Sequence, residues 1–460
     1  MEPTDADLLP FVRNAPLAVA TRALFEHLFR PEHIDPWFRR TAVAQYDHEL
    51  AFSALIELMA AVSFRRQKSV RSAYVSAGAG RWPVTLSAVY QKLQHVEPDV
   101  CAALVTDTAS DLTALLALSG RPPASLLPGR RVMGVDGSHA AATDHRLKVL
   151  RGTTLAARPG QALVVRDYQT GLLGAMVPDE DAHRNEKALI PGLFRHIRAG
   201  DVWLGDRAFE AASLIAGLID RGACFVLRRH ARGPRWEATG PFGEAVITPE
   251  GNQVDECPAV IHLGPERVVA IRLVRVRLAK PTQDGDRELQ IVTNLPVAEA
   301  SAVRIAELYR DRWKLEGAFQ VVEELMHGEI PSLGYPKAAL FAMALSLVAY
   351  NVIATVKRFA ATAMDVEGDE VSDHQVAVEV QTVTEGMMIA VPPARWQPLG
   401  YLGPVKLADW LTRAVAGLDP TKYRKTKRGS KKPALPRNGS SSHVATARLL
   451  QAKNKRTNEP

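Results

Sequence analysis

The chain has 460 residues, of which 47% are hydrophobic, so it can bury the cores of two or three globular units and is not a disordered protein. Its three cysteines, Cys101, Cys224 and Cys257, are widely spaced and lack histidines at metal-ligand spacing. This argues against a zinc site or a disulfide framework and predicts buried thiols in a reducing cytoplasm. The net charge of +7 is a modest indication of an anionic partner.

Residues 1–125 predict an all-α N-terminal domain. Apolar residues recur every three or four positions, and breaks that contain Pro or Gly separate these runs. The acidic start, MEPTDADLLP, lacks the basic region of a signal peptide. DNA binding by this domain stays an open expectation, because its one basic cluster, SFRRQKSVRSAY, comes without a helix-turn-helix signature.

Residues 126–372 predict a mixed α/β domain that begins after a Pro- and Gly-rich linker. Its first strand, RVMGVDGS, ends in Asp136. Two further β runs, 145–157 and 161–177, follow with turn residues between them. Three antiparallel strands are therefore expected at the start of this domain.

A βαβ unit is predicted next. After a helix over 181–197, the strand DVWLGDRAF carries Asp206, and the helix EAASLIAGLIDRG and the strand CFVLRRH complete the unit. Parallel pairing of its two strands is expected. Residues 231–287 are rich in Gly, Pro, Val and charged residues with short β runs, so they predict a β-rich insertion before the strand ELQIVTNLP.

The stretch YRDRWKLEGAF lies in a run from 299 to 326 that predicts one helix. Tyr309, Arg312, Trp313 and Glu316 then stand at positions i, i+3, i+4 and i+7 and share one face. One interpretation is an Arg312–Glu316 ion pair on a solvated face, worth about 0.2–0.5 kcal/mol, with both aromatic rings packed inward. The other interpretation is that this face of the helix forms a functional site together with the strand-end residues Asp136 and Asp206.

The C-terminal part of the chain predicts helices and then a charged tail. Residues 338–356 carry no charge, and their polar interruptions favour a buried core helix over a membrane span. A helical segment is expected over 373–420. Residues 421–460 contain twelve Lys and Arg and one acid, a net charge of +11, which leaves −4 for the other 420 residues.

The tail, residues 421–460, cannot bury a core and should be disordered when alone. Its Lys425, Lys427 and Arg428 are predicted to neutralise DNA phosphates. The alternative is a tail that only increases solubility.

Three acids carry the predicted chemistry. Asp136 next to Gly137 could cap a turn, and Asp206 next to Arg207 could form an ion pair. Together with Glu316 they form a set of carboxylates on successive core elements. Such hard oxygen ligands hold Mg²⁺ or Mn²⁺, and two ions about 3.5–4 Å apart can clamp the attacking and leaving oxygens of a phosphoryl transfer.

Four motifs in order carry a family resemblance. GVDGS with Asp136, LGDRAF with Asp206, VTNLP, and YRDRWKLEGAF with Glu316 are similar to the DDE transposases of bacterial insertion sequences, of the insertion-sequence-four type, over about residues 131–359. The resemblance implies an α/β fold whose core is a ribonuclease-H-like mixed sheet. The segment 231–287 would be its β-rich insertion, with the all-α domain before the core and the basic tail after it.

The resemblance implies roles for individual residues. Asp136, Asp206 and Glu316 match the catalytic triad that binds two Mg²⁺ or Mn²⁺ ions. Tyr309 and Arg312 fit the Tyr-x2-Arg-x3-Glu signature, whose Tyr and Arg contact end DNA near the scissile phosphate.

Two further positions, Glu323 and Trp313, bear on the predicted DNA contacts. Glu323 stands where the family often has a Lys, which puts one phosphate contact in doubt. Trp313 would either stack on a displaced base or pack into the core.

In the family, an insertion like 231–287 is tied to hairpin formation on the flanking DNA end. Hairpin formation by this chain is an extrapolation from the family.

The implied activity is that of a transposase. A homodimer assembled on double-stranded DNA would bind the ends of its insertion sequence and catalyse metal-dependent cleavage and strand transfer into target DNA. It would act in the bacterial cytoplasm at the nucleoid, with no membrane and no nucleotide cofactor, since no GxxxxGK[ST] loop is present. The alternatives are a non-joining nuclease of the same fold and an inactive protein that binds DNA ends.

Overall fold

The fold is described from a computed structural model. The described residues are 2–425, apart from 4, 46–48, 65, 79, 122–124, 141, 145–146, 152–153, 155, 283–284, 326–329 and 331. Packing divides the chain into Met1–Arg424 and Lys425–Pro460. Lys427 and Arg428 lie outside the described residues, so their predicted DNA contacts stay predictions.

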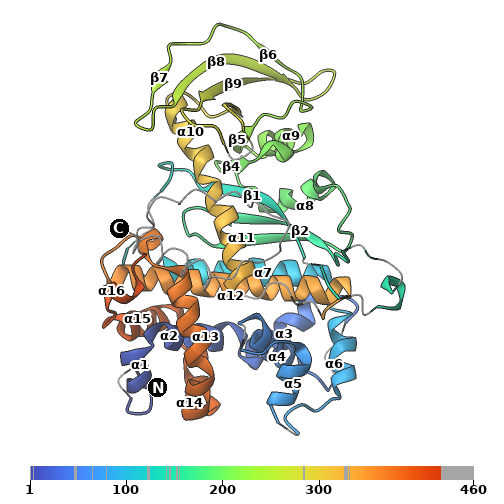
Figure 1. The fold of residues 1–460 in the computed structure, drawn as a ribbon, viewed down its shortest axis with the longest axis vertical. Coiled ribbons are helices and arrows are strands. Elements are labelled where there is room, and N and C mark those ends of the chain that lie inside the picture. The colour runs from blue at the N-terminus through green and yellow to red at the C-terminus, as the bar shows by residue number, and fades with distance from the viewer. Residues whose placement is uncertain are drawn as a thin grey trace, which may run out of the picture. The chain divides into compact units, whose positions relative to one another are not determined.

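Helices precede the sheet, flank its strands and form most of the C-terminal part (Figure 1). Short 3-10 turns occur between some of them. The α-helices are α1 (Leu9–Asn14), α2 (Pro16–Phe29), α3 (Pro31–Thr41), α4 (Phe52–Ser63), α5 (Val70–Ser76), α6 (Leu86–Leu93), α7 (Pro98–Leu116), α8 (Ile190–Leu193), α9 (Ala212–Asp220), α10 (Ala302–Asp311), α11 (Trp313–Leu325), α12 (Pro336–Ala363), α13 (Asp373–Ala390), α14 (Pro393–Gly400), α15 (Pro404–Val415) and α16 (Pro420–Tyr423).

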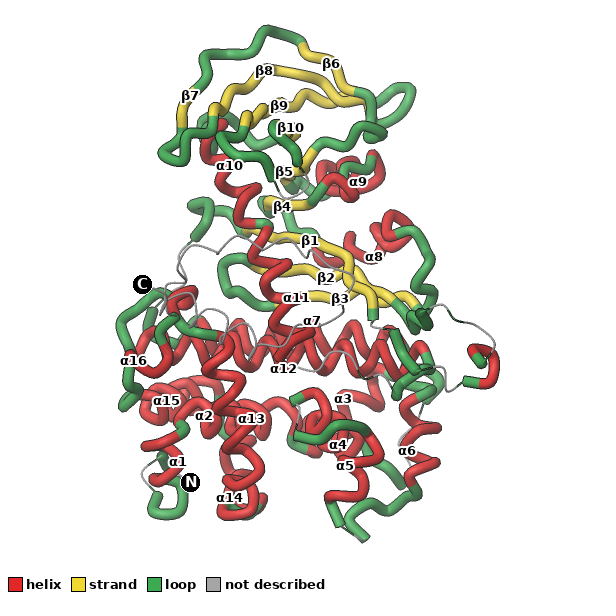
Figure 2. Tube along the Cα trace, viewed as in Figure 1, coloured by secondary structure: helices red, strands yellow, loops and turns green. Residues whose placement is uncertain are grey.

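The strands form one mixed sheet in the order β3-β2-β1-β4-β5-β10-β9-β8-β6, with β7 paired to β8 (Figure 2). Its strands are β1 (Val132–His139), β2 (Gln161–Asp167), β3 (Leu173–Asp179), β4 (Val202–Gly205), β5 (Cys224–Arg228), β6 (Trp236–Ala238), β7 (Val246–Ile247), β8 (Gln253–His262), β9 (Val268–Arg277) and β10 (Glu288–Thr293). β1, β2 and β3 pair antiparallel, whereas β4 pairs parallel with β1 and with β5. The order 3-2-1-4-5 with these orientations is that of a ribonuclease-H-like core.

The βαβ unit and the β-rich insertion are confirmed. β4, α9 and β5 form the parallel unit, and the segment predicted at 231–287 contains β6 to β9. The insertion does not form a separate sheet, because β9 pairs with β10 and β10 pairs with β5. The core sheet therefore continues through β10 into the insertion.

One of the first three predicted strands, the one at 145–157, is wrong. The described residues of 145–157 form a short 3-10 turn, Lys148–Leu150, and no strand. The run 161–177 instead supplies both β2 and β3, because Gly171 adopts a φ of +80° and the chain reverses there. The helix predicted over 181–197 is likewise a series of short helical pieces, with Pro191 at the start of α8.

Alternation along the strands divides the sheet side chains between two faces. Met133 and Val135 of β1 belong to the cluster that includes Leu193 and Leu214, next to α8 and α9. Val132 belongs to a different cluster, with residues of α10. Since Val132, Gly134 and Asp136 share the period-two face, Asp136 lies on the α10 side of the sheet.

α12 is the buried helix that was predicted at 338–356. By length and composition alone it could cross a membrane, but nearly all of its apolar window is buried inside the protein. It packs on α7, α2 and α4, and with α7 it lies against β3 (Figure 1). Asn351 fastens α12 to the sheet by bonding both the backbone NH and the carbonyl of Leu173, at 2.7 and 2.9 Å.

The N-terminal helices share one hydrophobic core with α12 to α15. Residues 1–125 are helical as expected, and they pack within the unit Met1–Arg424. The predicted limits at 125, 372 and 420 therefore mark changes of composition along a chain whose helices pack together.

Glu379 of α13 joins the two ends of this unit. Its carboxylate is only 5% exposed and accepts hydrogen bonds from the backbone NH groups of Leu17 and Ala18, at 2.9 and 3.2 Å. It also accepts from the hydroxyl of the buried Tyr423 and from Lys422 Nζ, the latter at 3.0 Å. The acid therefore neutralises the N-terminus of α2 and holds α16 in place.

We expect Glu379→Ala to lower the free energy of unfolding by about 3 kcal/mol, because it leaves buried donors and Lys422 without their acceptor. Denaturant unfolding measures this loss. Glu385→Gln, on the exposed side of the same helix, is the control and should change the unfolding free energy by less than about 0.5 kcal/mol. Equal effects of the two substitutions would contradict the role of Glu379.

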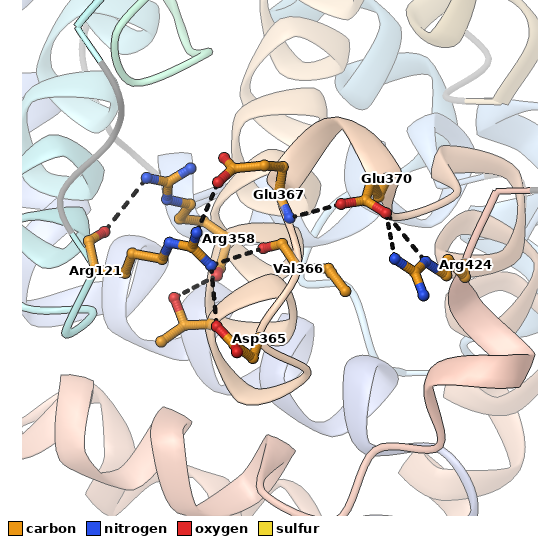
Figure 3. Close-up of polar contacts among 8 residues, drawn as sticks. Arg121, Arg358, Asp365, Val366, Glu367, Glu370 and Arg424 are labelled. Carbon is orange, nitrogen blue, oxygen red and sulfur yellow. Dashed lines mark hydrogen bonds and ion pairs between the residues drawn. The ribbon is translucent and has the colours of Figure 1, made fainter.

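The root of the tail is also fixed by ion pairs (Figure 3). Arg424 donates to Glu370 Oε2 at 2.6 Å, in the loop after α12. In the same loop, Glu367 accepts from Nη2 of Arg121 at 2.7 Å, which ties the linker before β1 to the C-terminal part. The basic tail thus starts from a defined point on the unit Met1–Arg424.

Candidate active site

Asp136 and Asp206 come from adjacent parallel strands. The register pairs Val132 with Val202 and Gly134 with Leu204, so its continuation by two positions sets Asp136 opposite Asp206. Asp136 lies inside β1, and Asp206 directly follows β4. Parallel strands end at the same edge of a sheet, which is why two motifs 70 residues apart in sequence reach one place.

β10 ends at Thr293, and the residues after it lead to α10, which lies on the same face of the sheet as Asp136. In the VTNLP motif, Thr293 Oγ1 donates to the carbonyl of Phe225 at 2.6 Å, and Asn294 Oδ1 accepts from the Phe225 NH at 2.9 Å. Ser301 then caps α10 by accepting from the NH of Arg304. This motif therefore has a structural role: it locks β10 to β5 and sets where α10 begins.

The helix predicted over 299–326 is not continuous. α10 ends at Asp311, Arg312 lies in a turn, and α11 starts at Trp313. The backbone NH of Arg312 bonds the Tyr309 carbonyl, and the NH of Leu315 bonds the Arg312 carbonyl, so the chain tightens to i→i+3 bonds at this point. The expectation of one uninterrupted helix is therefore wrong, and the interruption falls within the signature itself.

Polar contacts join the signature residues to the aspartates. The Tyr309 hydroxyl donates to Asp206 Oδ1 at 2.9 Å. Arg312 Nη1 lies 2.7 Å from Glu316 Oε1 and 3.6 Å from Asp136 Oδ2. The structure thus brings all five side chains together, with the guanidinium between two of the acids.

The interpretation of a solvated ion pair does not describe this site. The Arg312 side chain is 5% exposed, and its Nε has no hydrogen-bond partner among the described residues. Tyr309 is buried at 4% exposure, as expected for an inward-facing ring. Trp313 is 55% exposed, so packing of this ring into the core is wrong, and the Arg312 guanidinium carbon lies 5.2 Å from its centre.

The two aspartates differ in their electrostatic surroundings. Burial raises the pKa of Asp136 to about 6; Arg312 and the Gly137 NH offset this only in part, and Glu316 and Glu186 add negative charge. Burial would also raise the pKa of Asp206, but the Arg207 NH, Arg312 and the Tyr309 hydroxyl stabilise its carboxylate and hold the pKa below its ordinary value.

Glu186 is a fourth acid at the site. A Cβ placed on Gly137 would lie 2.0 Å from Glu186 Oε1, so Gly137 makes room for this carboxylate beside Asp136. Glu186 begins the 3-10 turn Glu186–Leu189, and its closeness to Gly137 comes from the fold. Gly137 and Glu186 are therefore part of the candidate site.

The donor set fits a hard divalent cation. Asp136, Asp206 and Glu316 supply carboxylate oxygens, and the pKa of Asp136 is raised mainly by burial and to a smaller extent by the nearby Glu316 and Glu186. The described residues contain no group of three His, Cys, Asp or Glu side chains already gathered as a metal site. The Arg312 guanidinium lies 2.7 Å from Glu316 and 3.6 Å from Asp136, so its positive charge reduces the repulsion between these two carboxylates.

The remaining predicted DNA contact on a described residue is Lys425, which is exposed at the start of the tail. Sequence reasoning missed Arg166 and Tyr168, which contact the turn at Arg312 from β2 and from the residue after it. A charged residue and a tyrosine at the end of the otherwise apolar run QALVV were the available signal.

The strand order defines a ribonuclease-H-like core, and the candidate acids lie on one face of its sheet. Residues 128–352 match the family model described as the transposase DDE domain. The matched segment contains Asp136, Asp206 and Glu316. Residues 128–352 therefore match a transposase DDE domain, whereas the insertion-sequence-four type stays a prediction.

Comparison with known proteins adds little beyond this domain. No curated protein matches the chain. Among solved structures, a similar one is described as the cryo-EM structure of the piggyBac transposase synaptic complex with hairpin DNA. It shares 8% identity, the match covers 87% of this chain and 86% of that chain, and the TM-score is 0.38. A TM-score of this size marks only a loose likeness and carries no argument about this chain.

Proposed function

We propose that this protein binds the ends of its insertion sequence and catalyses metal-dependent DNA cleavage followed by strand transfer. The observation that carries the proposal is the convergence of Asp136, Asp206 and Glu316 on one face of the sheet, linked through Arg312 and Tyr309. The DDE domain match over residues 128–352 supports it.

The three carboxylates would hold two Mg²⁺ or Mn²⁺ ions. When bound, such ions lower the pKa of water and neutralise charge on the phosphate. Asp136, with its raised pKa, would become fully ionised beside a cation, since the cation balances the charge that burial disfavours.

The protein's own side chains would position the DNA. Arg312 is a buried, permanently charged group and would hold a backbone phosphate next to the acids. Tyr309 orients Asp206 through its hydroxyl, and the exposed ring of Trp313 offers a stacking surface for a base. No covalent protein–DNA intermediate is needed, because positioning and charge supply the rate.

The proposal extends to the assembly and the place of action. Two ends must be processed together, which favours a homodimer formed on double-stranded DNA, with the basic tail adding phosphate contacts. The protein would act in the bacterial cytoplasm on the nucleoid.

The test is cleavage of the element's own end sequences, taken from the DNA that flanks the coding region. We expect nicking with Mg²⁺ or Mn²⁺ that stops when EDTA removes the metal and returns when the metal is restored. Joining of the released 3′-hydroxyl to a second duplex would then establish strand transfer. Nicking without joining would indicate a nuclease, and binding without nicking would indicate an inactive end-binding protein.

A further inference from the structure

The turn at Arg312 is held from outside the helices. The carbonyl of Arg312 accepts a hydrogen bond from the Tyr168 hydroxyl at 3.2 Å. Two residues later, the carbonyl of Lys314 accepts from Arg166 Nη1 at 3.0 Å. These bonds come from residues 144 and 148 positions away in sequence, and they fall on the two carbonyls that flank Trp313.

Arg166 is itself fixed between two aromatic rings. Its Nη1 also donates to the hydroxyl of Tyr350 in α12 at 2.9 Å. The guanidinium carbon lies 5.8 Å from the centre of the Tyr168 ring and 6.0 Å from the centre of the Tyr350 ring. Both tyrosines are buried, so the arginine has little freedom to leave the Lys314 carbonyl.

The backbone of β1 leaves space for this arrangement. A Cβ on Gly134 would lie 2.5 Å from Tyr168 Cε2, closer than any side chain could tolerate. Gly134 pairs with Arg166 across β1 and β2 and lies two residues before Asp136 on the same face. The ring of Tyr168 therefore crosses the strand that carries Asp136 to reach the turn that carries Arg312.

We infer that Arg166, Tyr168 and Tyr350 form a positioning network that sets the turn between α10 and α11 and thereby aims Glu316 and Arg312 at Asp136. The backbone hydrogen bonds change to i→i+3 bonds at this residue, which keeps helical dihedral angles, so the contacts that hold the turn would set the direction in which α11 leaves it. Glu316 lies in the first turn of α11, so a rotation of this turn moves its carboxylate directly. The expected effect on nicking rests on the proposed function, whereas the expected effect on the turn between α10 and α11 does not.

The experiment compares Tyr168→Phe, Arg166→Met and the conservative Arg166→Lys with the full-length protein. Two readouts are used: metal-dependent nicking of end DNA, and backbone hydrogen exchange of the peptide covering residues 309–320. The matched control is Thr355→Val, which also removes one buried hydroxyl bonded to a backbone carbonyl, at 2.8 Å, but within α12 and away from the turn.

We expect Tyr168→Phe and Arg166→Met to lower kcat about 10- to 100-fold with little change in KM, since a displacement of about 1 Å at a reacting centre can cost about 100-fold. Exchange at residues 309–320 should become faster in both variants. Arg166→Lys keeps the charge and one donor and should recover part of the rate. Thr355→Val should change neither readout.

The outcomes test the positioning network separately from the proposed function. Exchange at 309–320 that matches the original protein in all variants would overturn the network, whatever the rates. An equal loss of rate in Thr355→Val would also overturn it, since the effect would then be general destabilisation. A full-length protein without nicking would refute the proposed function, while faster exchange in Tyr168→Phe and Arg166→Met would still support the network.

Discussion

Glu316→Gln is expected to lower the rate of metal-dependent nicking by about 1,000-fold or more while binding of end DNA persists. The substitution keeps the size of the side chain and an amide oxygen that can still accept from Arg312, now 2.7 Å from the carboxylate. It removes the charge that would complete the metal-binding set with Asp136 and Asp206. The measurement pairs single-turnover nicking with an electrophoretic binding assay.

Glu307→Gln is the matched control for Glu316→Gln. Glu307 also lies within the signature helices and forms an ion pair with a nearby arginine, Arg304, at 2.6 Å, but it is not among the acids of the site. We expect its nicking rate to stay within about two-fold of the original, because exposed ion pairs contribute little. Equal nicking by Glu316→Gln and the original protein would remove Glu316 from the active site.

Truncation after Lys425 is expected to weaken DNA binding and to flatten its salt dependence by several units of log slope. The removed segment carries nine Lys and Arg and one acid, and each neutralised phosphate contributes about 0.9 to the slope on duplex DNA. The position of the cut follows from the structure. A cut after Thr421 would also remove the buried Tyr423 and the contacts of Lys422 and Arg424, and so confound binding with stability.

A charge variant of the full-length chain separates charge from length in this experiment. It replaces four tail residues by Gln: Lys427, Arg428, Lys431 and Lys432. If these residues contact phosphates, the slope should fall by about three to four units. An unchanged slope in both the truncated protein and the charge variant would place the electrostatic contacts on residues 1–425 and leave the rest of the tail a solubilising role.

The two experiments also report on different steps. Glu316→Gln acts on the chemical step and leaves the charge of the tail intact, whereas the truncation acts on binding and leaves the three acids intact. A protein that loses nicking only through weaker binding should recover at low salt or high protein concentration. The Glu316→Gln protein should not recover under either condition.

The sequence by itself determined the βαβ unit, the insertion and the candidate acids. Alternation of apolar residues and turn signals are local properties, so β1 with Asp136 and β4 with Asp206 could be predicted without knowledge of their neighbours. The uncharged run at 338–356 likewise predicted α12 from composition. Motif order then connected Glu316 with the two aspartates.

Only the tertiary structure decided how these parts meet. The break at Arg312 could not be predicted, because its carbonyl is held by Tyr168, 144 residues earlier, and no local signal opposes a continuous helix there. The placement of β2 and β3 within one run, and the absence of a strand in the described part of 145–157, depended on which segment could pair with β1. Burial of Arg312 and exposure of Trp313 followed from the same turn. Local periodicity assigns an element its type, but the partners that fix its ends and its direction come from distant parts of the chain.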